Sequence, residues 1–105
     1  MVQFLATVAE FDQACASTNL TVIDFTATWC PPCQMIGPKF VAMAGEAGFS
    51  GVTFVKLDVD ANDQASAKAG ITCMPTFQCY KGGAKVDQLE GADENALRAM
   101  ITKNM

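Results

Sequence analysis

The sequence contains no histidine, and its charged residues are scarce, at 17% of the chain. Without histidine, Ser-His and Cys-His catalysis and every histidine-ligated metal site are excluded. Seven basic residues against eleven acidic ones give a formal net charge of −4. Nucleic acid and anionic membranes both need clustered Lys and Arg, so neither is expected as the main partner. No run of about 18 apolar residues occurs, so no membrane-spanning segment is predicted.

The chain does have a high apolar content in a short length. Half of its 105 residues are hydrophobic, which argues against intrinsic disorder. We expect one domain over residues 1–105, because no repeat, linker or low-complexity stretch divides the chain. The five cysteines are an odd number and lack the regular spacing of a secreted disulfide scaffold. Together with an N-terminal segment unlike a signal peptide, they favour the reducing cytoplasm.

Hydrophobic periodicity predicts alternating strands and helices. The β-branched run 21–26 is apolar almost throughout, as expected of a central strand buried on both faces. Early alternation of strands and helices gives parallel strands, whereas Gly82-Gly83 predicts a late antiparallel hairpin. We therefore predict an α/β fold with a central mixed five-stranded sheet flanked by four helices. The expected strands are 2–5, 21–26, 52–58, 76–80 and 84–89, and the expected helices are 7–15, 31–47, 62–69 and a last one capped by Asp93.

The most informative stretch is Trp29-Cys30-Pro31-Pro32-Cys33, which follows the expected central strand and opens the next helix. At a helix N-terminus, unpaired backbone N–H groups and the helix dipole stabilise a thiolate, the reactive form of cysteine. Two intervening residues in a helical turn let the sulfurs meet in a disulfide. We expect Cys30, at the more exposed end, to be the attacking nucleophile and Cys33 to resolve the mixed disulfide.

Zinc binding and simple packing of two thiols are the alternatives for this pair. A structural zinc site needs four ligands, and Cys73 and Cys79, six residues apart, are poorly spaced to supply the other two. Redox chemistry is therefore the favoured interpretation. Cys15 and Cys79 fall on apolar faces and are expected to act as small core hydrophobes.

Around this motif the sequence resembles the thioredoxin family, and the resemblance covers essentially the whole chain. Residues 24–38 follow the family pattern around its active site, and Val59-Asp60, Met74-Pro75-Thr76-Phe77 and Gly91-Ala92 follow in the same order. The resemblance implies the thioredoxin fold and a protein-disulfide reductase that works by dithiol–disulfide exchange. It also implies no bound cofactor or metal, with electrons supplied from NADPH through thioredoxin reductase.

The resemblance further implies roles for individual residues. Asp24 matches the family's buried carboxylate, which would accept the proton of Cys33, and a carboxylate in an apolar strand has a raised pKa. Lys56 matches a lysine that some thioredoxins place near this aspartate. Pro75 matches a cis-proline that presents the backbone of Met74 to an extended substrate segment. A solvated aspartate, an ordinary surface lysine and a trans-proline are the respective alternatives.

Other matching residues would form the face that receives substrates. Trp29 matches a surface tryptophan beside the nucleophile and is expected to hydrogen-bond Asp60, although a core tryptophan is the alternative. Cys73 should lie near this face, where animal cytosolic thioredoxins have a cysteine that can join two molecules, so we expect a monomer with a Cys73-linked dimer on oxidation. Gly91 and Ala92 would complete a flat apolar rim, unless they only form a turn. The expected substrate-binding residues are thus Trp29, Pro31, Pro32, Asp60, Cys73, Met74, Pro75, Gly91 and Ala92.

Two residues depart from the commonest family pattern. Pro31 stands where most thioredoxins have glycine. It removes one backbone N–H near the thiolate and stiffens the dithiol loop, and both effects favour the disulfide. Gln34 replaces the usual basic residue, which weakens the positive charge near Cys30 and bears on recognition by the reductase.

The expected partners are thioredoxin reductase and disulfide-containing proteins such as peroxiredoxins and ribonucleotide reductase. An isomerase or oxidase, a glutaredoxin and a non-catalytic binding module are the competing functions. An oxidase needs a strongly stabilised thiolate, to which Pro31 and Pro32 contribute nothing. A glutaredoxin has tyrosine rather than proline at position 32. A binding module would not need Cys30, Cys33 and Asp24 together.

Overall fold

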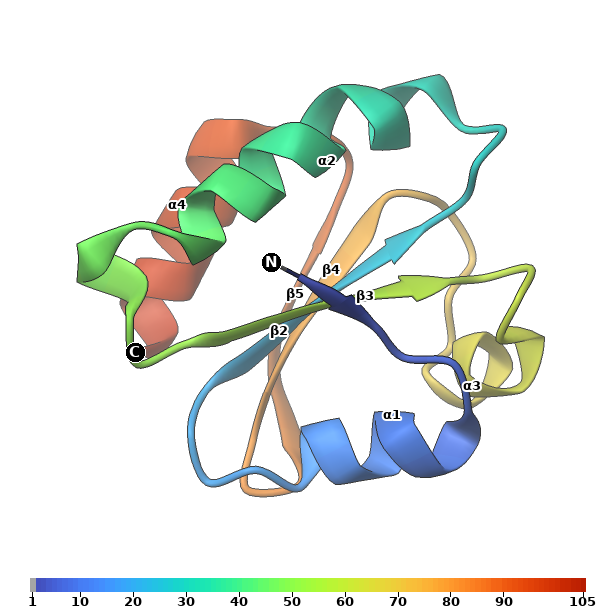
Figure 1. Ribbon diagram of the computed structural model, residues 1–105, viewed down its shortest axis with the longest axis horizontal. Coiled ribbons are helices and arrows are strands. Elements are labelled where there is room, and N and C mark those ends of the chain that lie inside the picture. The colour runs from blue at the N-terminus through green and yellow to red at the C-terminus, as the bar shows by residue number, and fades with distance from the viewer. Residues whose placement is uncertain (1) are drawn as a thin grey trace.

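The computed structural model describes residues 2–105, which form a five-stranded sheet with helices on both faces (Figure 1). The strands are β1 (Gln3–Phe4), β2 (Thr21–Thr26), β3 (Thr53–Asp58), β4 (Thr76–Lys81) and β5 (Ala84–Glu90), and the helices are α1 (Val8–Cys15), α2 (Pro31–Ala44), α3 (Asp63–Lys68) and α4 (Glu94–Asn104). The strand order is β1-β3-β2-β4-β5, with β1, β3 and β2 parallel and β4 antiparallel to both of its neighbours. The predicted mixed sheet and four helices are therefore confirmed.

Strand β2 occupies the centre of the sheet, and all six of its residues are buried. Its side chains alternate between two apolar clusters, because successive residues of a strand point to opposite faces. Val22 packs with residues of α2 and α4, whereas Ile23 and Phe25 pack with residues of α1 and α3. Figure 1 shows these two helix pairs on opposite sides of the sheet. Asp24 shares the face of Val22 and so lies on the α2 side.

Helix starts follow local side-chain capping. Thr7, Asn62 and Asp93 precede α1, α3 and α4, and each side-chain oxygen accepts the backbone N–H three residues ahead. Such caps satisfy a donor that the first helical turn leaves unpaired. Among residues 2–105, none of the helices combines the length and apolar character that crossing a membrane requires.

Most predicted ends lie within one residue of the observed ones, and two of the differences have a clear structural cause. Helix α2 ends at Ala44 instead of continuing through Ala47, because Gly45 caps it and a short 3-10 turn, Ala47–Phe49, follows. That turn still directs Phe49 into the core, which explains why the apolar spacing continues past the helix. The first strand is only Gln3–Phe4, since β1 pairs with β3 at just these two positions.

Candidate active site

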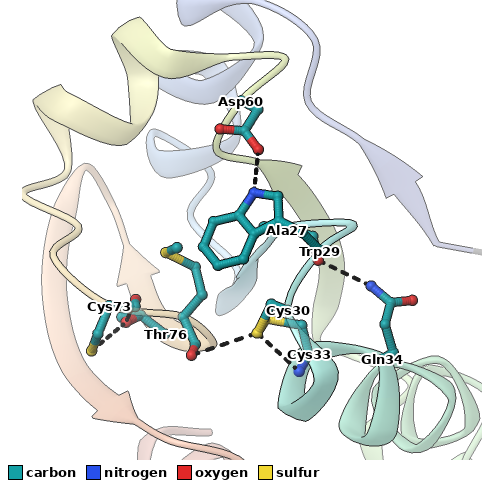
Figure 2. Close-up of a disulfide and its surroundings, with 9 residues drawn as sticks. Ala27, Trp29, Cys30, Cys33, Gln34, Asp60, Cys73 and Thr76 are labelled. Atoms are coloured by element: carbon teal, nitrogen blue, oxygen red, sulfur yellow. Dashed lines mark hydrogen bonds between the residues drawn. A yellow bond between two sulfur atoms is a disulfide. The ribbon is translucent and has the colours of Figure 1, made fainter.

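Cys30 and Cys33 form a disulfide at the N-terminus of α2 (Figure 2). Cys30 is the N-cap with an extended backbone, and Pro31 and Pro32 occupy the first two helical positions. Proline suits these positions, because its fixed φ is already helical and its missing N–H would have had no partner within the helix. The two Cα atoms are 5.3 Å apart, which lies within the usual range for a disulfide.

The backbone N–H of Cys33 donates a hydrogen bond to Cys30 Sγ at 3.2 Å. Because Pro31 and Pro32 carry no N–H, this is the one donor that the first three helical residues can offer to the sulfur. In the reduced protein the same N–H and the positive end of α2 would stabilise a thiolate on Cys30. Cys30 is only marginally the more exposed residue of the pair, at 4% against 2% for Cys33, since Ala27, Val59 and Met74 pack around both.

The loop before β4 lies against the disulfide. Its Met74–Pro75 peptide bond is cis, as expected, and the Met74 carbonyl oxygen is 3.7 Å from Cys30 Sγ. The N–H of Gly91 donates to the Pro75 carbonyl at 2.9 Å, with a Gly91 φ of +104° that residues with a side chain rarely adopt. Gly91 therefore ties a second loop to the cis-proline. The sequence alone did not distinguish this role of Gly91 from that of a simple turn. Ala92 is partly buried against the core.

Trp29 projects from the surface beside the disulfide, with 63% of its area exposed. Its indole N–H donates to Asp60 Oδ2 at 2.7 Å, which confirms the expected contact (Figure 2). Asp60 is held in turn by Asp58, whose Oδ1 accepts the backbone N–H groups of Asp60 and Ala61 at 2.9 and 3.2 Å. The turn after β3 thus fixes the indole ring.

Asp24 is 1% exposed, and neither of its carboxylate oxygens accepts a hydrogen bond from any residue of the described chain. It stands opposite Lys56 in the parallel β2–β3 pairing. Burial raises the pKa of Asp24 to about 7, while the positive charge of Lys56 acts in the opposite direction. A carboxyl group with this pKa can hold or release a proton at neutral pH, as general acid–base chemistry needs.

Two features near the disulfide were not predicted. Gln34 Nε2 donates to the Ala27 carbonyl at 3.0 Å and so ties α2 to the preceding loop, whereas the sequence indicated only a missing positive charge (Figure 2). A groove of about 460 Å³ also opens between α2 and the end of β3, with Cys33, Gly37 and Lys56 in its wall. A glycine inside an otherwise helical pattern was the only sequence signal for this groove.

The other three cysteines differ in accessibility. Cys73 is exposed, as expected, and its carbonyl accepts the Thr76 hydroxyl at 2.7 Å. Cys15 and Cys79 are buried in the two core clusters, which confirms their predicted packing role. Burial raises the pKa of Cys15 to about 11 and that of Cys79 to about 12, so both stay as unreactive thiols. Within residues 2–105, no three His, Cys, Asp or Glu side chains are grouped to hold a metal ion.

Comparisons with known proteins agree with this geometry. A sequence model of the thioredoxin family matches residues 2–103. Thioredoxin from Geodia cydonium is 53% identical over 99% of both chains. The crystal structure of Malassezia sympodialis thioredoxin, 42% identical, covers 97% of this chain and 91% of its own with a TM-score of 0.93. A structure describing how a yeast mitochondrial 1-Cys peroxiredoxin is resolved via glutathione/thioredoxin systems is 32% identical, covers 97% and 94%, and has a TM-score of 0.90. The chain therefore belongs to the thioredoxin family of thiol–disulfide oxidoreductases, with Cys30 and Cys33 as its redox-active pair.

Proposed function

We propose that this protein-disulfide reductase is a cytoplasmic thioredoxin of the Cys-Pro-Pro-Cys type. It is recharged by thioredoxin reductase with electrons from NADPH and needs no bound cofactor. The observation that carries the proposal is the Cys30–Cys33 disulfide at the start of α2, with the buried Asp24 on the same side of the sheet. Three further cysteines outside the disulfide, one of them exposed, suit a reducing compartment.

The reaction transfers two electrons from the cysteine pair to a substrate disulfide. The Cys30 thiolate attacks one substrate sulfur, and the second substrate sulfur leaves and takes up a proton. Cys33 then gives its proton to Asp24 and attacks Cys30 Sγ in the mixed disulfide. This step releases the first substrate sulfur as a thiolate, which takes up a proton from water, and leaves the Cys30–Cys33 disulfide. Lys56 tunes the pKa of Asp24 through its charge.

The substrate segment lies on the face around the cis-proline. The backbone of Met74 pairs with an extended substrate chain in the manner of an added strand. Trp29, held by Asp60, forms one side of this face, and Gly91 and Ala92 form the other, with Pro31 and Pro32 next to the sulfurs. Peroxiredoxins and ribonucleotide reductase present disulfides of the required kind, and the yeast structure described above concerns a peroxiredoxin.

The exposed thiol of Cys73 can form a disulfide with a second chain when the protein is oxidised. Two chains joined by a Cys73–Cys73 disulfide would cover each other's Met74 and Pro75, which follow Cys73 directly. The protein is thus a monomer when reduced and a covalent dimer of low activity when this thiol is oxidised.

The reduction potential of the Cys30–Cys33 couple tests the proposed direction of electron flow. Thioredoxins have potentials of about −270 mV, disulfide isomerases about −180 mV and the oxidase DsbA about −120 mV. We expect a value near or below −270 mV in equilibrium with dithiothreitol, measured on Cys73→Ser so that no other exposed thiol contributes. A value near −180 mV or above would instead assign the protein to isomerisation or oxidation.

Replacing Pro31 with glycine is expected to raise the potential, which makes the protein a weaker reductant. Glycine restores an N–H in the first turn of α2 and loosens the dithiol loop, and both effects favour the reduced form. One hydrogen bond contributes about 0.5–1.5 kcal/mol, which corresponds to roughly 10–30 mV for a two-electron couple. The same equilibrium with dithiothreitol measures the difference, and a lower potential in Pro31→Gly would contradict the argument.

A further inference from the structure

Gly37 lies one helical turn after Cys33, where α2 passes over Lys56. It is buried in the wall of the groove that Cys33 and Lys56 also line. A methyl group at position 37 would lie 3.2 Å from Lys56 Nζ, closer than such a carbon normally approaches another heavy atom. No other glycine of residues 2–105 would bring an added carbon this near to a charged side chain.

Glycine is otherwise a poor residue for this position. In a helix interior it is less favourable than alanine, because the unfolded chain gains more freedom and no side chain packs. Gly48 and Gly51, outside the helix, have nothing within 4 Å of the position that a side chain would take. Gly37 thus combines an unfavourable residue type with a close approach to one cation.

The Lys56 ammonium is confined on two sides. The ring of Phe4 lies 5.8 Å from Nζ, and Gly37 approaches it from α2. The charged groups that face this position are Asp24 on β2, the register partner of Lys56, and Asp58, two residues along β3 in the same groove wall. Neither α2 nor β1 adds a charged side chain to the groove.

We propose that Gly37 is a positioning residue whose missing side chain keeps the Lys56 ammonium beside the Asp24 carboxyl group. The groove is the open space next to the half-buried lysine, and Asp24 is not among the residues that line it. We therefore expect an ammonium displaced by a side chain at position 37 to move into the groove and away from Asp24. The positive charge that favours ionised Asp24 then weakens. The effect on catalysis rests on the proposed role of Asp24 as proton acceptor, but the effect on its ionisation does not.

The test is to measure the pKa of Asp24 in Gly37→Ala by carboxyl ¹³C NMR of the oxidised protein. If the ammonium retreats by a few tenths of an ångström in a medium of effective dielectric constant about 20, the pKa of Asp24 rises by roughly 0.1–0.2. The acid limb of the pH–rate profile for disulfide reduction moves upward by the same amount. Gly48→Ala, which adds a methyl group to open space, is the matched control and leaves the pKa of Asp24 unchanged.

A double-mutant cycle with Lys56→Met separates charge positioning from a general distortion of α2. In the Lys56→Met background, Gly37→Ala has no ammonium to displace and leaves the pKa of Asp24 unaltered. An unchanged or lowered pKa in Gly37→Ala alone, or an equal rise in both backgrounds, would overturn the proposal.

Pro38 offers a different reason for glycine at position 37, because a proline ring crowds the side chain of the residue before it. Pro38→Ala and Gly37→Ala/Pro38→Ala both lack this crowding, so comparing them isolates the effect of the side chain at position 37. The same pair serves as the test if Gly37→Ala alone does not fold. The rise in the pKa of Asp24 persists in that pair if Lys56 is the reason. If it disappears there, Gly37 only makes room for the ring of Pro38 and the proposal is wrong.

Discussion

Cys33→Ser is expected to convert the protein from a catalyst with many turnovers into one that stays covalently attached to its substrates. Cys30 keeps its place at the N-terminus of α2, so it still attacks a substrate disulfide. The mixed disulfide then persists, because serine cannot displace a sulfur from it. Steady-state reduction of insulin disulfides should be lost completely. Non-reducing electrophoresis and mass spectrometry should show one substrate molecule bound per chain.

Two control variants identify the atom that holds the substrate. Cys30→Ser should neither turn over nor trap substrates, since Cys33 lies inside the first turn of α2 and lacks the N-cap place that stabilises a thiolate on Cys30. Cys33→Ser/Cys73→Ser should trap as efficiently as Cys33→Ser, which excludes the exposed thiol of Cys73 as the point of attachment. Trapping by Cys30→Ser at the same level, or turnover by Cys33→Ser, would reverse the assigned roles of the two cysteines.

The sheet and the cysteine pair could be predicted because their signals are local in the sequence. The run 21–26 is apolar in nearly every position, and only the centre of a sheet with two covered faces buries such a strand. The spacing of Cys30 and Cys33 at a helix start likewise determines that the sulfurs meet. The wrong end of α2 had a local cause too, since the apolar spacing continues into the 3-10 turn that buries Phe49.

Two contacts at the site could not be predicted, because they depend on how elements distant in sequence are packed. The approach of Gly37 to Lys56 follows from the way α2 crosses β3. The positive φ of Gly91 follows from its hydrogen bond to Pro75, sixteen residues earlier in the chain. The sequence shows only which residues are small or charged, and their distances arise from tertiary packing.

Asp24→Asn is expected to stabilise the protein strongly at alkaline pH and hardly at all at acid pH. Burial raises the pKa of Asp24 to about 7, against about 3.9 for an aspartate in an unfolded chain. Between these values the unfolded chain releases the proton while the folded protein keeps it, so stability falls as pH rises from about 4 to about 7. Asparagine does not titrate and avoids this loss.

Three pKa units correspond to about 4 kcal/mol. We therefore expect the free energy of unfolding of Asp24→Asn, compared with that of the parent protein, to be about 2–4 kcal/mol more favourable at pH 8 than at pH 4. Urea denaturation of the oxidised forms at several pH values measures this difference, and a gain that stays constant with pH would contradict it.

The same substitution removes the proton acceptor for Cys33 and should slow release of the mixed disulfide. Gain of stability together with loss of turnover in one variant would show that Asp24 opposes folding at neutral pH and is there for the chemistry.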